Sequence, residues 1–185
     1  MALATKTANR HTTVATRWST PSNAYATTGD NNYATLASAK NTTRSGDFGF
    51  PDFTTSDIPN GSTINSVTIY VEWGMTASVT GGVLGCMPRL NNADAGTELT
   101  KTTTTEEAQS VAFTTVPTLT QLRSAESSDL VEARIRVTKG STSTGMTGNL
   151  DYVYIVVNYD PPPNTNVSLT AAAAATGAAA NVTGA

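Results

Sequence analysis

The chain has 185 residues, enough for one ordinary domain and a tail, and only 14% of them are charged, against about 25% in an average soluble domain. Its 11 basic and 14 acidic residues leave a formal net charge of −3, and the basic residues are scattered, which excludes a strongly basic nucleic-acid-binding surface. The single cysteine, Cys86, excludes an internal disulfide, and the single histidine, His11, argues against a histidine-based triad or metal site. No stretch of ~18 strongly apolar residues occurs, so we expect no membrane-spanning helix.

Threonine is the commonest residue, at about one position in five. Branching at Cβ stiffens the side chains of Thr, Val and Ile, which therefore suit a pleated, half-buried strand better than a helix. The composition predicts an all-β fold, and the strand pattern favours an antiparallel, jelly-roll-like β-sandwich with extended N- and C-terminal arms.

Residues 1–16 are rich in Thr and Ala and show no apolar periodicity, so we predict an extended N-terminal arm. Residues 18–57 carry frequent turn signals and spaced aromatic residues, which indicate long loops. Such rings usually pin a loop to the sheet beneath it. The alternative is an exposed platform on which a ligand stacks, with Tyr25 and Tyr33 as the candidates.

The first clear strand begins near residue 64, after a turn over residues 58–62. Apolar and polar residues alternate along it, which places four apolar side chains on one face. These are Val67, Ile69, Val71 and Trp73. Shorter strands are predicted over residues 82–87 and 110–113, and a helical turn within residues 119–130.

Two further strands are predicted over residues 130–137 and 150–159. The connection over residues 139–148 is rich in Gly, Ser and Thr, so we predict that the two strands are antiparallel neighbours joined as a hairpin. Three prolines from residue 161 end the domain, because proline has no N–H to donate to a strand ladder. The side chains expected in the core are Val67, Ile69, Val71, Ile135, Val137, Val153 and Ile155.

The sequence thus divides into an N-terminal arm (1–16), a β-sandwich domain (17–160) and a Pro-started, Ala-rich C-terminal arm (161–185). The two arms carry Lys6 and Arg10 and no carboxylate, so little keeps them solvated. Ordering about 40 residues opposes folding by roughly 1–2 kcal/mol each, which contacts with other subunits can offset. We therefore expect the arms to bind neighbouring proteins in an assembly.

Most carboxylates lie in loops or on the outward phase of predicted strands, where we expect them to be solvated. Two groups offer oxygen ligands of the kind that Ca²⁺ takes, at residues 30–32 and at residues 91–94. Neither group has the spacing of a calcium loop. Turn formation explains both better, because Asp and Asn side chains bond to their own backbone.

Cys86 lies in an apolar, Gly-flanked strand, where a small core residue is a better interpretation than a nucleophile. Its obvious partner, His11, is far away in the sequence, and no phosphate-binding loop or dinucleotide fingerprint occurs. We therefore assign no catalytic, cofactor-binding or metal-binding residue, and we expect no enzyme, no cofactor and no required metal.

Five short motifs follow one another between residues 17 and 160. They are Trp18-Ser-Thr-Pro-Ser-Asn-Ala-Tyr-Ala, residues 30–34, Phe48-Gly-Phe, Ile58-Pro-Asn-Gly-Ser-Thr-Ile with the strand that follows, and Leu150-Asp-Tyr-Val-Tyr-Ile-Val-Val-Asn-Tyr. This succession resembles a group of tailed-bacteriophage virion proteins, and the Ala-rich end is similar to short repeats that follow such domains. The resemblance implies a jelly-roll-like sandwich with a structural role. Ser62 and Ser66 stand where the group usually has Ala and Gly or Ile, departures that leave the expected fold intact.

Three functions stay open. The first is a capsid decoration or auxiliary protein of a bacteriophage virion. We expect synthesis in the host cytoplasm, because residues 1–6 lack the apolar stretch of a signal peptide. The second is a tail or fibre component of the virion, and the third is a carbohydrate-binding β-sandwich module. The expected partners are the major capsid protein or neighbouring copies of this chain, as a homo-oligomer in the particle, with neither nucleic acid nor membrane as a partner.

Overall fold

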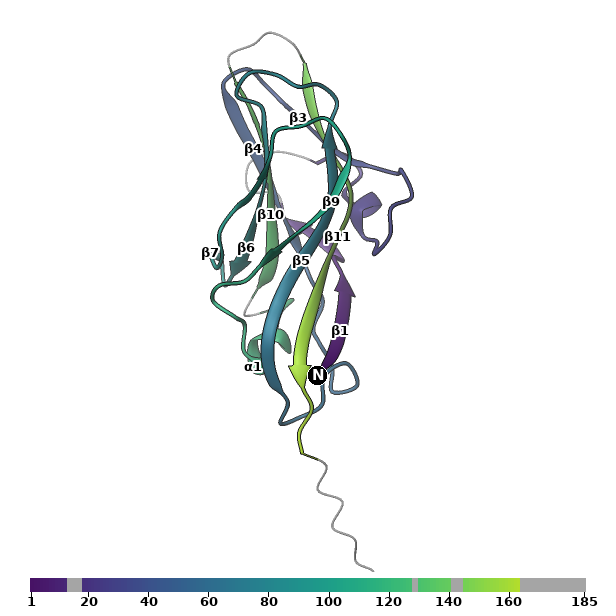
Figure 1. Cartoon of the computed structure of the whole chain (residues 1–185), viewed down its shortest axis with the longest axis vertical. Helices are drawn as coiled ribbons and strands as arrows, with labels where there is room; N and C mark the ends of the chain where they lie inside the picture. Colours follow the sequence, from purple (N-terminus) through teal and green to yellow (C-terminus); the bar gives the residue numbers. More distant parts are fainter. Residues whose placement is uncertain (13–17, 128–129, 141–144, 164–185) are drawn as a thin grey trace, which may run out of the picture.

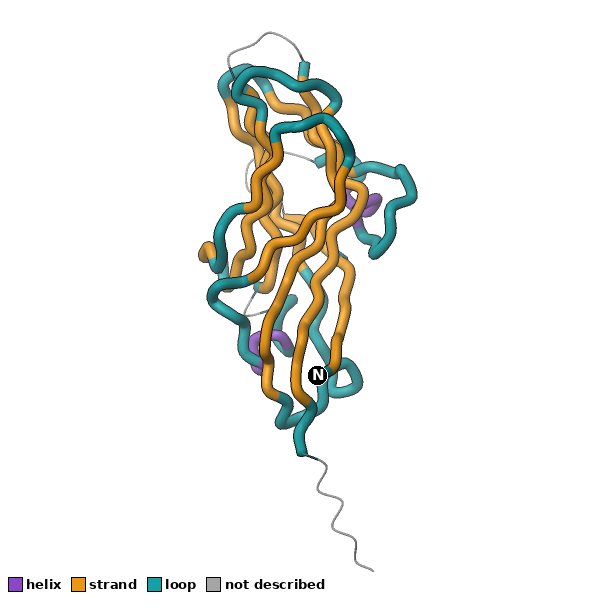
Figure 2. Tube along the Cα trace, in the orientation of Figure 1, coloured by secondary structure: helices purple, strands orange, loops and turns teal. Residues whose placement is uncertain are grey.

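Alternation of apolar and polar residues along the strands builds two antiparallel β-sheets, which pack face to face as an elongated sandwich (Figures 1 and 2). The computed structural model describes residues 1–12, 18–127, 130–140 and 145–163. Every pairing between its named strands is antiparallel. The expected all-β sandwich is therefore confirmed.

Sheet A has five strands in the order β1, β11, β5 and β9, with β3 beside the first part of β11. The strands are β1 (Ala2–Thr7), β3 (Ala34–Ser38), β5 (Thr63–Met75), β9 (Glu107–Ala112) and β11 (Met146–Asp160). The two longest strands, β5 and β11, lie side by side along the length of the molecule (Figure 1). They form the centre of this sheet.

Sheet B has six strands in the order β2, β4, β10, β6 and β7, and β8 also pairs with β6. The strands are β2 (Arg10–Thr12), β4 (Thr42–Gly49), β6 (Val83–Leu90), β7 (Ala93–Asp94), β8 (Leu99–Lys101) and β10 (Val131–Lys139). The described residues also include two four-residue helices, η1 (Pro21–Ala24) and α1 (Leu119–Leu122). In the described part of the chain, no helix has the length and apolar character needed to cross a membrane.

The core lies between the two sheets, where their inward side chains are almost completely buried. All the side chains that the sequence places in the core are at most 1% exposed, namely Val67, Ile69, Val71, Ile135, Val137, Val153 and Ile155. Trp73 extends this row along β5, and Trp18 packs edge-on against Phe48 of β4 with ring centroids 5.6 Å apart. The face assignments made from periodicity are confirmed.

The N-terminal segment is extended, but it is part of the sandwich, so the predicted domain boundary, which sets residues 1–16 apart as an arm, is wrong for residues 1–12. β1 pairs with β11 in sheet A, and β2 pairs with β4 in sheet B. Ala4 and Ala8 are buried, and Nζ of Lys6 lies 2.8 Å from Oδ2 of Asp57. An edge strand pairs through its backbone, so it forms without the apolar periodicity that marks a central strand.

The two ends of the predicted arms lie outside the described residues. Residues 13–17 follow β2, and residues 164–185 follow the prolines that come after β11. Residues 161–163 form no strand, as their prolines predict. The proposed role of the C-terminal arm therefore stays a prediction.

The last two strands are not the hairpin that the sequence indicated. β10 pairs with β4 and β6 in sheet B, whereas β11 pairs with β1, β3 and β5 in sheet A. The chain crosses from one sheet to the other between them. Both strands bury a continuous apolar face, and facing sheets satisfy that requirement as well as neighbouring strands do.

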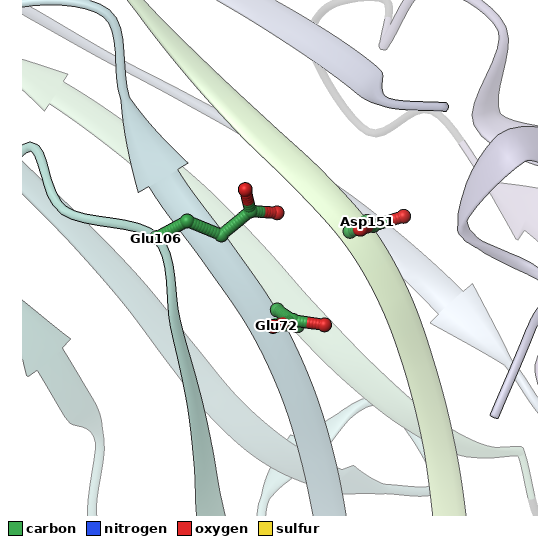
Figure 3. Close-up of side chains that lie close together, drawn as sticks. All are labelled: Glu72, Glu106 and Asp151. Atoms are coloured by element: carbon green, nitrogen blue, oxygen red, sulfur yellow. The ribbon is translucent and has the colours of Figure 1, made fainter. Parts of the chain in front are cut away.

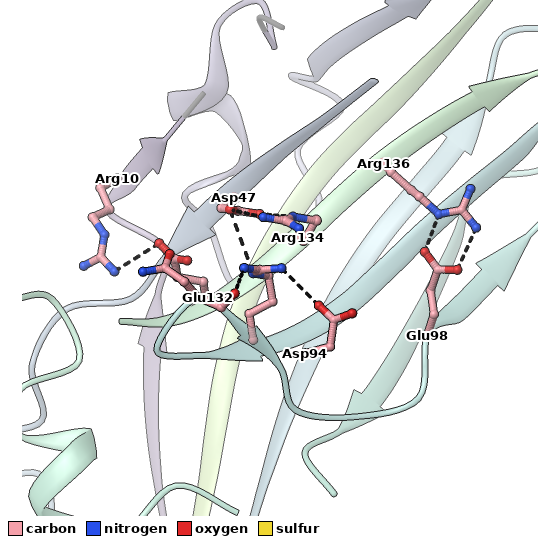
Figure 4. A network of polar contacts seen from close by, with 9 residues as sticks. Arg10, Asp47, Asp94, Glu98, Glu132, Arg134 and Arg136 are labelled. Carbon is pink, nitrogen blue, oxygen red and sulfur yellow. Dashed lines mark hydrogen bonds and ion pairs between the residues drawn. The ribbon is translucent and has the colours of Figure 1, made fainter. Parts of the chain in front are cut away.

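The outer face of sheet B carries a network of ion pairs (Figure 4). The guanidinium of Arg134 donates two hydrogen bonds, of 2.8 and 2.9 Å, to the carboxylate of Asp47. The other pairs are Arg89–Asp47, Arg89–Asp94, Arg10–Glu132 and Arg136–Glu98. The expectation of solvated carboxylates is wrong for Asp47 and Glu132, which are 2% and 3% exposed, because arginines from neighbouring strands cover them.

Candidate functional site

A β-bulge in β11 shapes the outer face of sheet A. Leu150 pairs with Trp73, and Tyr152 pairs with the preceding residue of β5, Glu72, so Asp151 is the extra residue between them. Leu150 stays in the core, whereas Asp151 comes to lie beside Glu72 (Figure 3). The bulge therefore brings a carboxylate and a tyrosine to the same outer face.

Three tyrosines form a row on this face, which we call the tyrosine row: Tyr70, Tyr152 and Tyr154. Tyr70 and Tyr154 are direct partners across β5 and β11, and their rings stack with centroids 5.0 Å apart and planes 4° from parallel. Tyr152 follows along β11, with its ring centroid 5.4 Å from that of Tyr154. Tyr70 and Tyr154 are partly exposed, and Tyr152 is 9% exposed. The hydroxyl groups of the three make no hydrogen bond among the described residues.

A groove of about 720 Å³ opens beside the stacked pair, and we call it the tyrosine groove. The outward side chains of β1 form one part of its lining, because Thr7 pairs with Tyr154 and Thr5 with Val156. The main lining residues are Leu3, Thr5, Thr7, Thr27, Tyr70 and Tyr154. Lys6 also contributes, but its ammonium group is paired with Asp57, so the groove carries little net charge.

Three carboxylates gather near the bulge, at the end of the tyrosine row, and we call them the carboxylate cluster: Glu72, Glu106 and Asp151 (Figure 3). Oxygen atoms of the three lie within 4.8 Å of one another. Glu72 comes from β5, Asp151 from the bulge in β11, and Glu106 from the residue just before β9. Residues that are far apart in the sequence therefore meet here.

Hydrogen bonds stabilise two of these carboxylates. The backbone N–H groups of Asp30 and Asn31 donate to Asp151 over 3.3 and 3.2 Å. The hydroxyl of Tyr33 donates to Oε2 of Glu106 over 2.7 Å, and this bond raises the pKa of Tyr33 to about 12. The loop over residues 29–33 thus closes over the cluster.

Glu72 is the carboxylate without such support, since it accepts no hydrogen bond among the described residues. Partial burial raises the pKa of Glu72, and the charges of Glu106 and Asp151 raise it further. A Cβ atom at Gly29 would lie 2.5 Å from Oε2 of Glu72, so only glycine fits this loop position without rearrangement.

Carboxylate oxygens are the ligands that hard cations such as Ca²⁺ prefer. Oε1 of Glu106 is buried and has no hydrogen-bond partner in the described part of the chain. The cluster could therefore hold a cation. Close carboxylates also occur without an ion, and the donors to Asp151 and Glu106 already stabilise two of the negative charges, so the arrangement alone establishes no metal site.

The residues considered as calcium ligands from the sequence are used in turns and ion pairs. Asp30 accepts hydrogen bonds from the backbone N–H and the side-chain amide of Asn32, both over 2.9 Å. Asp94 accepts one from Arg89 over 3.0 Å, and the carbonyl of Asn92 accepts another from the same guanidinium. Turn formation therefore accounts for the first group, as predicted. In the second group Asp94 lies in β7, and its ion pair with Arg89 accounts for its carboxylate instead.

The two tyrosines considered as stacking residues serve other purposes. Tyr25 ends η1 and packs against the core, and Tyr33 donates its hydroxyl to Glu106. The aromatic row on the outer face lies elsewhere, with Tyr70 and Tyr154 partly exposed, and sequence reasoning missed it. One signal was present, since Tyr152 and Tyr154 are two residues apart and must share a face of a strand. Their partner Tyr70 and the bulge are visible only once the strands are paired.

Cys86 and His11 occupy separate places, as expected. Cys86 is completely buried, and burial raises the pKa of its thiol above the ordinary value, which keeps it protonated and unreactive. His11 on β2 packs against the ring of Phe48 with centroids 5.0 Å apart. Burial lowers the pKa of His11, and the charge of Asp47 opposes this shift only in part.

Comparisons with known proteins identify no family for this chain, because no protein-family model and no curated protein matches the sequence. One solved structure similar to it is the CBM36-1 domain of a multidomain xylanase from the hindgut metagenome of Trinervitermes trinervoides, with a TM-score of 0.39, 7% identity, and coverage of 85% of this chain and 97% of that chain. Another is a family two carbohydrate esterase from Cellvibrio japonicus, with a TM-score of 0.23, 13% identity, and coverage of 71% and 36% respectively. Likenesses this distant transfer no function, and the fold assignment rests on the strand pairing.

Proposed function

We propose that this chain is a structural component of a tailed-bacteriophage virion, most simply a capsid decoration or auxiliary protein. The observation that carries the proposal is that motifs of the resemblance, distant in the sequence, contact one another in the fold. The Asp30 motif lies on the Leu150-Asp-Tyr motif, through the hydrogen bonds from residues 30 and 31 to Asp151. The Trp18 motif packs on the Phe48-Gly-Phe motif, through the edge-on ring contact.

Motifs that touch belong to one structural unit. The loop over residues 29–33 donates its hydrogen bonds to Asp151, so the two motifs hold each other in place. This contact supports the sandwich that the resemblance implies, and the structural role in a virion is proposed from the resemblance itself.

In this proposal the C-terminal segment, residues 161–185, attaches the protein to the particle. β1 and β2 are used inside the sandwich, so the N-terminal residues described are not available as a free arm. Residues 161–185 follow β11 and carry no charged side chain. We propose that they bind the major capsid protein or neighbouring copies of this chain, which places the protein in the virion as a homo-oligomer.

The test compares three forms of the protein for binding to purified phage particles: the full chain, a deletion of residues 164–185, and a chain in which those residues are replaced by an equally long Gly-Ser segment. Both altered forms are expected to keep the melting temperature of the full chain and to lose at least tenfold in particle-bound protein. Binding of both as tight as that of the full chain would remove the segment from the proposal. Absence of the full chain from particles by immunogold electron microscopy would overturn the virion assignment.

The same labelling separates the alternatives. Gold on the tail would assign the chain to the tail or fibre, the second of the functions that the sequence leaves open. A soluble monomer that never associates with particles would favour the free carbohydrate-binding module. The tyrosine row is the observation that favours this third function.

A further inference from the structure

We propose that the tyrosine groove is a binding site for a neutral oligosaccharide. The site goes beyond the virion role, because assembly of a particle needs no sugar. Four properties of the groove carry the inference: its aromatic surface, its unpaired hydroxyl groups, its lack of net charge and its size.

The aromatic surface comes from Tyr70 and Tyr154, whose rings stand parallel at 5.0 Å on the outer face of the sheet. Each is partly exposed on the strand phase opposite to the core residues Ile69 and Ile155. The face of a tyrosine ring is electron-rich, and the C–H bonds on one face of a pyranose ring are its electropositive counterpart. Tyr70 covers one face of the Tyr154 ring, and Thr7 of β1 is the partner of Tyr154 on its other side, where the groove lies. The side of Tyr154 towards β1 is therefore the stacking surface that we propose for a sugar.

Apart from Lys6, the polar part of the lining consists of hydroxyl groups without a partner among the described residues. The side-chain hydroxyls of Thr5, Thr7 and Thr27, and those of Tyr70 and Tyr154, make no hydrogen bond among the described residues. A hydroxyl both donates and accepts, which is the combination that a saccharide also presents. Burial raises the pKa of Tyr154, so its hydroxyl keeps its proton at neutral pH.

The charge of the face selects a neutral ligand. The one cation of the lining, Lys6, is held by Asp57 at 2.8 Å. The outward residues of β9 beside β5 are Ala108, Ser110 and Ala112, none of them charged. An anionic ligand would have no free cation in the groove, and it would meet the carboxylate cluster at the end of the tyrosine row. The outer face of sheet B, by contrast, is covered by ion pairs.

The size of the groove fits a short oligosaccharide. The groove has a volume of about 720 Å³, within the range of about 300–1,000 Å³ that is typical of ligand sites, and it is wide open to solvent, so it contacts a ligand from one side. It lies along neighbouring strands, from Leu3 and Thr7 on β1 to Tyr154 on β11 and Tyr70 on β5. Such a site suits a linear chain of sugar units with one ring on the tyrosine pair.

The experiment titrates the full chain with cellohexaose, maltohexaose and mannohexaose, and with a hexamer of galacturonate as the anionic comparison, and follows backbone amide shifts by NMR. At least one neutral hexasaccharide is expected to give saturable shifts at Thr5, Thr7, Tyr70 and Tyr154. The galacturonate hexamer is expected to bind at least tenfold more weakly. No saturable shift with any neutral probe, or shifts confined to residues outside the groove, would overturn the proposal.

Three variants test the assignment of residues. Tyr154→Ala is expected to weaken binding at least tenfold, and Thr7→Val, which replaces a hydroxyl by a methyl in a strand that accepts both residues, at least threefold. Tyr33→Ala is the matched control, since this tyrosine lies outside the groove, and it is expected to change affinity less than twofold. Thr7→Val and the shift map keep the test decisive if Tyr154→Ala lowers the melting temperature.

Two further results would count against the site. Unchanged affinity in both Tyr154→Ala and Thr7→Val would overturn it. So would concentration-dependent shifts at the groove without sugar, abolished by Tyr154→Ala, because the groove would then be an interface between copies of this chain. Neither result touches the virion role, which the particle-binding test decides separately.

Discussion

Ile69 is a residue at which the sequence-based prediction can be tested directly. Its side chain is fully buried, and its neighbours across the sheet are Ile155 on β11 and Val111 on β9. Ile69→Ala removes buried methyl and methylene groups and leaves a cavity, so it should lower the free energy of unfolding by about 2–5 kcal/mol. Urea denaturation measures this change, and a loss below about 0.5 kcal/mol would show that the assigned face is wrong.

The matched control is Thr68→Ala, one residue earlier on the same strand. Thr68 lies on the outer face, opposite Val156 and Ala112, and is partly exposed. Its replacement should change the free energy of unfolding by no more than about 1 kcal/mol. The difference between the two changes in the free energy of unfolding separates the effect of burial from the effect of the β-strand propensity of the residue.

Glu72 is a carboxylate whose charge no hydrogen bond stabilises within the described part of the chain. Its pKa is raised by burial and by Glu106 and Asp151, so the folded state holds this proton to higher pH than the unfolded chain does. Below the ordinary value of 4.5 both states are protonated and the group has no effect. As pH rises through and above the raised pKa, the ionised group progressively opposes folding.

Glu72→Gln should therefore stabilise the protein at pH 7, by up to about 1 kcal/mol, because solvent screens a partly exposed charge. The gain should disappear near pH 4, where glutamate is itself mostly neutral. Urea midpoints at the two pH values test this, with the exposed Glu126→Gln as the control. A loss of stability at pH 7 would contradict the prediction and would indicate that a bound cation uses this carboxylate.

The N-terminal strand is the element whose role differs most from the sequence-based expectation. β1 pairs with β11 over six residues and adds the Lys6–Asp57 ion pair. Deleting residues 2–7 would leave the edge of β11 without this partner and uncover the core beside Ala4. The free energy of unfolding should fall by more than about 1 kcal/mol, which corresponds to roughly 2–4 °C or more in melting temperature for a chain of this size.

Differential scanning calorimetry measures this effect. Leu3→Ser is the control, since Leu3 is 68% exposed and its side chain contributes little to the sheet. It should shift the melting temperature by less than about 2 °C. An unchanged melting temperature in the deletion would instead support the predicted extended arm outside the sandwich domain.

The periodicity of the sequence predicted which segments are strands, but it did not predict which strands pair with each other. β5, β10 and β11 all have the alternation that buries one face, and their core residues were predicted correctly. Alternation states which side of a strand faces the core, and it carries no information about which strand lies beside it. The predicted hairpin of β10 and β11 failed for this reason.

The whole molecule is held together by strand pairing and a continuous core, and we expect its stability to be independent of metal ions. The carboxylate cluster is the place where a required cation would bind, and two of its three members have hydrogen-bond donors. EDTA should therefore leave the melting temperature within about 1 °C of its value in buffer, and CaCl₂ should not raise it. A bound ion stabilises by mass action, so a fall of several degrees on chelation would refute the prediction.

The sequence by itself determined the fold class, the core faces of the long strands, the buried state of Cys86 and the turn at Asp30. Each of these depends on local composition or on the two-residue period of a strand, which a sequence displays directly. Only the tertiary structure decided the pairing of the N-terminal strand, the ion pairs of sheet B, the carboxylate cluster and the tyrosine groove. These features depend on the register between strands. The extra residue at Asp151 shows the reason, because one bulge changes which side chains share a face of the sheet. A bulge of this kind cannot be predicted from the local sequence pattern.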